Sequence, residues 1–134
     1  MRKLFLLLLF ILLAACDSNS PFSNLKTQSL ESFIVEKDLS DIDTIIIQHG
    51  SGEEKMIQSH EQIEEFLLLI KDVVYSPQEN QEGEVGWSFR IRLLEQKKEF
   101  DFLVNQIDDI YYDTNPDITH IVKEYFTSLE TTEK

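Results

Sequence analysis

The chain has 134 residues, of which 25 are Asp or Glu and 12 are Lys or Arg, so its formal net charge is −13. A chain this acidic lacks the basic surface with which proteins bind nucleic acid or anionic lipid headgroups. It contains one cysteine, which excludes a disulfide within the chain. The length suits one domain of ordinary size, held together by its own core.

The first fifteen residues have the features of an export signal. Arg2 and Lys3 precede twelve unbroken apolar residues, 4–15. As a helix these twelve would rise about 18 Å, well short of the roughly 30 Å of bilayer hydrocarbon. We therefore expect residues 1–15 to be a cleaved signal peptide and not a permanent membrane span.

The end of this run, Leu13-Ala14-Ala15-Cys16, resembles the lipobox of bacterial lipoproteins. The resemblance implies that the signal is cut before Cys16 and that this cysteine carries the lipid anchor. An incidental cysteine after an ordinary signal, or an uncleaved anchor, are the alternatives. Because Cys16 is the only cysteine and stands where a lipobox needs it, we expect lipidation and a place on the extracytoplasmic face of the cell membrane. Loss of Arg2 and Lys3 would leave ten basic against 25 acidic residues, a net charge of −15.

The remaining chain divides by composition. Residues 16–29 are rich in Ser and Asn and predict the lipidated cysteine followed by a flexible tether. We expect residues 30–130 to form a single globular domain and residues 131–134 to be a frayed tail.

Short strands are predicted at the start of the domain. Residues 32–36 weakly favour a strand over a helical turn. The β-branched run within 42–49 predicts a central strand. After a Gly-containing loop, residues 55–57 are expected to pair with it as a hairpin.

A first helix is predicted to begin at Ser59, since Ser59 and Gln62 match a capping box. Its apolar stripe extends to Val74 at steps of three and four residues. Leu68 and Leu69 widen the stripe, so we expect the helix to be covered on more than one side.

The second half opens with a polar loop, 76–86, followed by the clearest strand of the chain. Apolar and polar residues alternate over 87–94 and again over 100–105, as in half-buried strands. We expect a hairpin whose aromatic residues, Trp87 included, all face the core. Residues 110–112 predict a further short strand.

The last predicted element is a helix opened by Asn115 as the cap and Pro116 at the first helical position. Its stripe comprises Ile118, Ile121, Val122, Tyr125, Phe126 and Leu129. The order of elements predicts an α+β domain: an antiparallel sheet of about five or six strands with two amphipathic helices packed on one face.

No catalytic, cofactor or metal site is predicted. His60 to Glu64 has the shape of a zinc-binding H-E-x-x-H motif but ends in glutamate, so the second ligand is missing. Two groups of aspartates lack the spacing and the glycine of an EF-hand loop. They are Asp38, Asp41 and Asp43, and Asp108, Asp109 and Asp113. His49 and His120 have no partner at ligand or triad spacing.

Arg90 and Arg92 form the most distinctive polar pair, on the strand face opposite the core. One interpretation is structural, namely ion pairs across the hairpin with acids such as Glu99 or Asp101. The other is functional: an uncovered sheet face presents Arg90, Arg92 and Tyr111 as a partner-binding surface, because Arg and Tyr are favoured at interface hot spots.

Residues 38–129 resemble small lipoproteins of Gram-positive, low-GC bacteria that have no assigned function. The lipobox, Ile45-Ile46-Ile47-Gln48-His49-Gly50, Gly86-Trp87-Ser88-Phe89-Arg90 and the closing amphipathic helix carry this resemblance. It implies anchorage on the outer face of the cytoplasmic membrane and transfers no catalytic residue. We expect a non-enzymatic domain that binds or modulates another envelope protein. A small-molecule or cation-binding lipoprotein and a hydrolase with a dispersed site are the alternatives.

Overall fold

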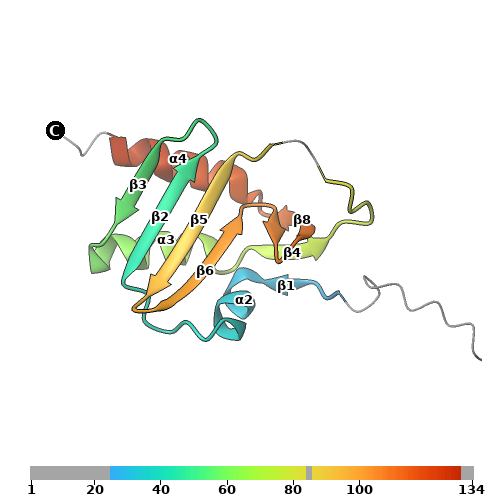
Figure 1. Cartoon of the computed structure of the whole chain (residues 1–134), viewed down its shortest axis with the longest axis horizontal. Helices are drawn as coiled ribbons and strands as arrows, with labels where there is room; N and C mark the ends of the chain where they lie inside the picture. The colour runs from blue at the N-terminus through green and yellow to red at the C-terminus, as the bar shows by residue number, and fades with distance from the viewer. Residues whose placement is uncertain (1–24, 84–85, 131–134) are drawn as a thin grey trace, which may run out of the picture.

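The computed structural model describes residues 25–83 and 86–130. These residues form an α+β fold in which one antiparallel sheet of eight strands packs against three helices (Figure 1). The predicted class is confirmed, whereas the predicted five or six strands and two helices were too few. The signal peptide, Cys16 and the frayed tail lie outside the described residues, so those expectations stay predictions.

The strands follow the order β1-β4-β8-β7-β6-β5-β2-β3 across the sheet. Their bounds are β1 Gln28–Ser29, β2 Thr44–His49, β3 Glu54–Ile57, β4 Val74–Pro77, β5 Phe89–Glu95, β6 Lys98–Leu103, β7 Gln106–Ile107 and β8 Ile110–Asn115. The helices are α2 Leu30–Glu36, α3 His60–Ile70 and α4 Ile118–Glu130. None of these described helices combines the length and the apolar character needed to cross a membrane.

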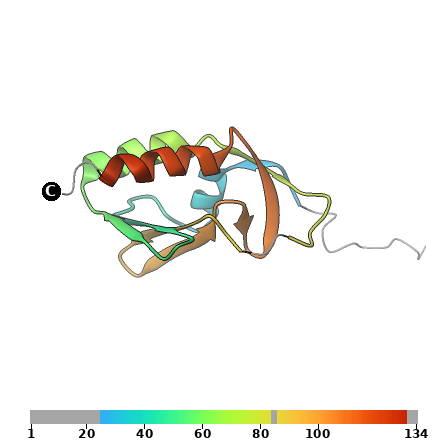
Figure 2. The same ribbon diagram turned by 90° about the horizontal axis from the view of Figure 1, so that it is seen from above.

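The elements are arranged in two layers. Helices α3 and α4 lie side by side on one face of the sheet, while no described helix covers the other face of β2, β3, β5 and β6 (Figure 2). We call this other face of β2, β3, β5 and β6, on the side away from α3 and α4, the open face. Short helix α2 packs beside β4 and β8, where Phe33 meets the rings of Tyr75 and Tyr112 edge-on at centroid distances of 5.7 and 5.6 Å.

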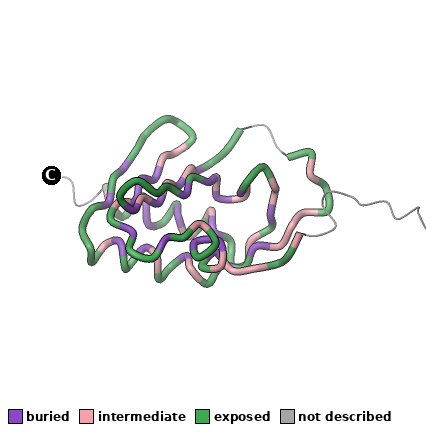
Figure 3. Tube along the Cα trace, turned by 60° about the horizontal axis from the view of Figure 1, so that its bottom comes forward, coloured by how far each residue is buried: buried purple, intermediate pink, exposed green. Residues whose placement is uncertain are grey.

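The predicted central hairpins are confirmed. Strand β2 pairs with β3 on one side and with β5 on the other, and β5 pairs with β6. Along β5 the residues Phe89, Ile91 and Leu93 are at most 3% exposed, whereas their neighbours are half-buried. Buried and more exposed stretches alternate along the chain trace (Figure 3), and the buried cluster joins residues of the sheet with residues of α2, α3 and α4.

The predicted core position of Trp87 was wrong. Strand β5 begins at Phe89, opposite the last residue of β2, His49, and Trp87 lies beyond that pairing with 37% of its surface exposed. The chain there is held by its backbone, because the N–H of Gly50 donates to the carbonyl of Ser88 at 2.7 Å. A side chain at Gly50 would collide with the Trp87 carbonyl, which would lie 2.5 Å from its Cβ.

The weakly predicted strand over 32–36 was also wrong, because these residues belong to helix α2. Ser29 caps the helix by accepting a hydrogen bond from the N–H of Ser32 at 3.3 Å. Leu30, Phe33 and Ile34 are buried at helical spacing. Gln28 and Ser29, the last residues of the predicted tether, form strand β1 beside β4.

Helix α3 starts as predicted but is shorter and is covered on one side only. The Ser59 hydroxyl accepts from the N–H of Gln62 at 3.5 Å, as the capping box predicts. The helix ends at Ile70, and the next residues turn the chain into β4. Leu68 and Leu69 are 64% and 47% exposed, so the expected second covering was wrong.

The start of helix α4 corrects the predicted cap. Asn115 is the last residue of β8, and Ile118 is the first helical residue. The carboxylate of Asp117 accepts from the N–H of Thr119 at 3.0 Å and so fills the capping role expected of Asn115. The predicted apolar stripe is confirmed, since its members are buried or half-buried.

Candidate functional site

The open face presents polar residues in rows set by strand register. Arg92 lies opposite Ile46 of β2 and Asp101 of β6, and Arg90 lies opposite Leu103. Because directly opposed residues in an antiparallel sheet point to the same side, these side chains share one surface. Arg90 and Arg92 therefore lie on the open face, on the side of β5 opposite the core residues.

Both arginines are held in ion pairs that run diagonally across the β5–β6 hairpin. The Arg90 guanidinium donates two hydrogen bonds to the Asp101 carboxylate, one of them from Nε to Oδ1 at 2.8 Å. Arg92 donates through Nε to Glu99. Hydrogen bonds from Arg90 hold the pKa of the Asp101 carboxyl below its usual value. The structural interpretation of the arginines, with the two acids named for it, is thus confirmed.

Tyr111 lies at the far end of the row that contains Arg90. Leu103 and Gln106 stand between them, since Leu103 pairs with Gln106 and Gln106 pairs with Tyr111. Three strand spacings of about 4.8 Å separate the two residues along the sheet. The structure therefore places Tyr111 on a different part of the sheet from the two arginines.

Tyr111 is covered by the described part of the β4–β5 loop. The side-chain amide of Gln81 donates to the Tyr111 carbonyl at 3.0 Å and accepts from the Tyr111 N–H at 2.9 Å. The Gln81 amide thus makes the two backbone hydrogen bonds that a residue of a neighbouring strand would make with Tyr111. Gly83 has a φ of +73° and passes so close that an added Cβ would lie 2.2 Å from the Tyr111 ring, so a side chain there would strain the backbone and displace the ring. Gln78 and Gln81 of this loop lie along β8, where both hydrogen-bond to its backbone.

The open face also carries apolar surface that the sequence did not single out. Met56 of edge strand β3 is 57% exposed and lies opposite Ile46, which in turn lies opposite Arg92. Leu94 and Leu103 are half-buried on the same side. Ile46 is only 6% exposed, so Met56 contributes the largest exposed aliphatic side chain of this row, next to the ion pairs. At the β6–β7 end of the open face, a shallow groove of about 390 Å³ is bordered by Arg90, Asp101, Phe102, Leu103, Gln106, Asp108 and Asp109.

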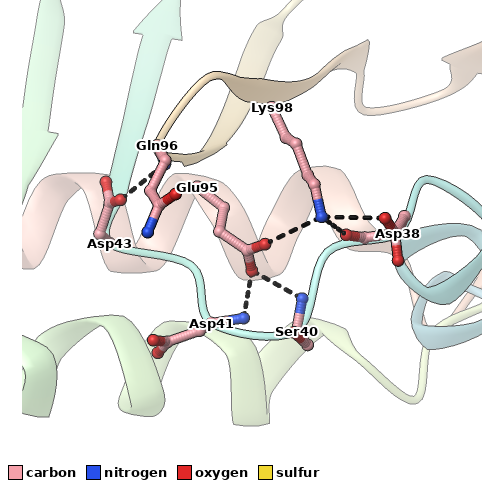
Figure 4. A network of polar contacts seen from close by, with 7 residues as sticks. All are labelled: Asp38, Ser40, Asp41, Asp43, Glu95, Gln96 and Lys98. Carbon is pink, nitrogen blue, oxygen red and sulfur yellow. Dashed lines mark hydrogen bonds and ion pairs between the residues drawn. The ribbon is translucent and has the colours of Figure 1, made fainter.

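The first group of aspartates belongs to a network that fixes the α2–β2 connection (Figure 4). The Glu95 carboxylate accepts from the N–H groups of Ser40 and Asp41, and these bonds hold its pKa below the usual value. Lys98 lies 2.9 Å from the Asp38 carboxylate and 3.6 Å from Glu95. Because the carboxylates of Glu95 and Asp38 already bind donors of the protein itself, we interpret the network as a structural brace.

The remaining acids give no metal centre within the described residues. Asp43 accepts from the N–H of Gln96 at 2.8 Å, and Lys37 donates to both oxygens of Asp108 at 2.9 and 2.8 Å. In residues 25–83 and 86–130 no three His, Cys, Asp or Glu side chains gather as a metal ion would need.

The histidines belong to different elements: His49 ends β2, His60 opens α3 and His120 lies in α4. His60 lies 3.0 Å from Glu64, and His120 lies 3.1 Å from Glu124, each one helical turn apart. Each of these pairs is an exposed contact within a single helix.

His49 has a partner that sequence spacing missed, since its Nδ1 is 2.8 Å from the Ser51 hydroxyl. An acyl-transfer site needs free N–H donors beside its nucleophile, and the N–H groups of this turn are already used. The N–H of Ser51 donates to His49 Nδ1, that of Gly52 to the His49 carbonyl and that of Gly50 to Ser88. Because these three N–H groups already donate hydrogen bonds at the base of the hairpin, they do not form an oxyanion hole beside Ser51.

The described residues form a small α+β domain in which helices cover one sheet surface and no described helix covers the other. No protein-family model, no curated protein and no solved structure matches the chain.

Proposed function

We propose that this chain is a lipid-anchored protein of the extracytoplasmic face of a bacterial cell membrane, and that its domain binds another envelope protein through the open face. The anchor rests on the lipobox ending in Cys16. The binding role rests chiefly on one observation. Met56, more than half exposed, lies in one row with Ile46, Arg92 and Asp101 on a sheet face that no described element covers.

The chemistry of this face suits a protein partner. Aliphatic side chains provide apolar area, and the arginines are already neutralised by Asp101 and Glu99, so their burial would not leave single charges unpaired. Arginine is also frequent at interface hot spots. We extend the site from Arg90 and Arg92 to include Met56, and assign Tyr111 to the neighbouring β8 surface.

Strand addition at the sheet edge is less suited to this role. Lys55 of edge strand β3 points inward, donates to the carbonyl of Phe126 at 2.7 Å and lies 4.2 Å from the centroid of its ring. An inward-pointing charge is a common device by which edge strands avoid pairing with other chains. The face of the sheet is therefore the better binding surface.

The anchor is tested by Cys16→Ser, which should abolish fatty-acid labelling and leave the precursor uncut. A matched variant restores a cysteine two residues further on, Cys16→Ser with Ser18→Cys, and should remain unlabelled because a lipobox depends on position. Normal maturation of Cys16→Ser to a membrane-bound, lipidated form would contradict the assignment.

The binding face is tested by photocrosslinking in intact cells, with a photoreactive residue at position 56 and, as the control, at position 69. Position 56 should capture a defined envelope protein, and position 69, on exposed α3, should not. Met56→Glu should abolish co-purification of that protein with the intact lipoprotein, whereas Leu69→Glu should preserve it. Equal capture from both positions, or from neither, would refute the open face as the binding surface.

A further inference from the structure

A second hollow lies on the helix side of the domain, between α2, the α2–β2 connection and α3. Its volume is about 310 Å³. The residues that line it are Glu31, Ile34, Val35, Leu39, Ser40, Ile42, Leu67 and Lys71. Five of these eight are aliphatic, so the hollow is an apolar groove. We call it the α2–α3 groove.

Exposed aliphatic residues continue from the groove onto the surface. Val35 forms part of its wall and is 68% exposed, and Leu68, the neighbour of Leu67, is 64% exposed. Single exposed aliphatic residues are ordinary on protein surfaces. Here they adjoin a hollow with walls of the same kind, which gives an apolar ligand a continuous contact.

The groove is held in shape by the brace around Glu95. Ser40, which lines the groove, donates its N–H to the Glu95 carboxylate at 2.7 Å, and the next N–H, that of Asp41, does the same. Leu39 and Ile42, on either side, are only 4% and 8% exposed. The wall formed by this connection is therefore fixed before any ligand arrives, which lowers the entropic cost of binding.

Charges in the lining and on the segments that form the walls indicate which ligand fits. Glu31 lies in the wall one helical turn before Val35, and Asp41 stands between two lining residues. Glu64, also 3.0 Å from His60, precedes Leu67 and Leu68 by about one turn of α3. The lining itself carries one acid, Glu31, and one cation, Lys71, while Asp41 and Glu64 are further acids on the segments that form its walls. An apolar floor whose walls carry more acids than cations complements a helix with one apolar and one basic face.

We propose that the α2–α3 groove binds a cationic amphipathic helix of another protein. Its aliphatic residues enter beside Val35 and Leu67, and its Lys or Arg residues lie against Glu31, Asp41 and Glu64. The net charge of −13 adds long-range attraction for such a partner. This inference is independent of the open face and goes beyond the function proposed above.

The test uses three synthetic helical peptides and the intact chain in nanodiscs of zwitterionic lipid, with empty nanodiscs as the baseline. One peptide has Leu on one face and Lys on the other. A second replaces every Lys with Glu, and a third keeps the Leu and Lys composition with the pattern scrambled. A photoactivatable leucine in each peptide maps its contact by mass spectrometry, and anisotropy of a fluorescent label gives its affinity.

The patterned Lys peptide should bind and crosslink to residues of the groove, and the other two should not. Val35→Ala should weaken its binding about fivefold through lost apolar contact. Glu31→Lys with Asp41→Lys should weaken it about tenfold through charge repulsion. Two control variants should change the affinity less than twofold. Leu69→Ala truncates an exposed aliphatic residue of α3 and is the control for Val35→Ala. Glu79→Lys with Glu82→Lys, on the β4–β5 loop, changes the net charge by as much as Glu31→Lys with Asp41→Lys. Thermal melting checks that each variant is folded.

Three results would overturn the proposal. Equal binding of the Lys and Glu peptides would mean that the groove accepts apolar ligands without regard to charge. Equal binding of the scrambled peptide, or equal loss in the Glu79/Glu82 variant, would mean attraction by net charge alone. Crosslinks confined to lipid, to another surface or to a second copy of the chain would assign the groove a different occupant.

Discussion

The two faces of strand β5 differ in what determines their side-chain contacts. On the inner face Phe89, Ile91 and Leu93 are at most 3% exposed, between the sheet and the helices. On the open face Arg90 and Arg92 reach diagonally to acids of β6. The inner face follows from the alternation of apolar residues within one strand, whereas the open face is organised by pairs between strands. Stability should therefore depend on the inner face, and binding on the open one.

The largest effect that separates the two faces is expected at adjacent positions of β6. Phe102 is 3% exposed and stacks on Phe100 at a centroid distance of 4.5 Å, while Leu103 is half-buried on the open face. Phe102→Ala should lower the free energy of unfolding by about 3–5 kcal/mol through lost burial and a cavity. Leu103→Ala should cost no more than about 1 kcal/mol. Urea denaturation of both variants measures the difference, and similar losses would show that the open face is also covered.

The inner face was the part of the fold that the sequence predicted best. Alternation over β5 and β6 and the stripes of α3 and α4 are local patterns, and burial of one side follows directly from them. Pairing of Arg92 with Glu99 could likewise be anticipated, since a tight hairpin sets its own register.

Helix α2 could not be assigned in this way. Its seven residues contain Phe33-Ile34-Val35, which is as compatible with a strand as with a helical turn. The choice is made by the Ser29 cap and by Phe33 packing on Tyr75 and Tyr112, which are far away in the sequence. The α2–α3 groove was missed for the same reason, because it exists only when α2 is a helix.

The partners of the buried and half-buried polar groups also lay beyond prediction from the sequence. Lys55 is 8% exposed in an otherwise alternating strand, and its contact with the carbonyl of Phe126 joins residues 71 positions apart. The pairing of Gln81 with Tyr111 joins residues 30 positions apart. Sequence patterns describe which side of an element is apolar, but they do not show which remote backbone group a polar side chain meets.

A smaller, pH-dependent effect is expected where the inner row of β5 ends in a carboxylate. Glu95 follows Phe89, Ile91 and Leu93 on the same side but accepts hydrogen bonds instead of packing. Because its pKa in the fold is lowered, chiefly by the N–H of Asp41, the unfolded chain binds a proton at a higher pH than the folded chain does. The stabilisation is therefore complete above the ordinary Glu pKa of about 4.3 and is lost as the pH falls through the lower folded value.

Glu95→Gln should remove this contribution, so its melting temperature should be lower than that of the unaltered chain at pH 7 and should approach it on acidification. The loss at pH 7 should be smaller than that of Phe102→Ala, since no apolar volume is removed. Glu79→Gln, an exposed change of the same charge, is the control and should leave the acid limb of the curve unchanged. A constant offset between Glu95→Gln and the unaltered chain from pH 7 to pH 3 would show that the carboxylate charge is not what holds the connection.

The smallest effect on stability is expected from the arginines of the open face. The side chains of Arg90 and Asp101 are 41% and 35% exposed, and water screens an ion pair of this kind. Arg90→Gln with Arg92→Gln should lower the free energy of unfolding by only about 0.2–1 kcal/mol for each pair. A double-mutant cycle of Arg90→Gln with Asp101→Asn isolates the pair, and its coupling energy should shrink at high salt.

If the double arginine variant is nearly as stable as the unaltered chain yet fails to retain the protein crosslinked at position 56, the arginines serve binding. A loss comparable to that of Phe102→Ala would make them part of the stabilising framework, and the contrast between the two faces would then fail.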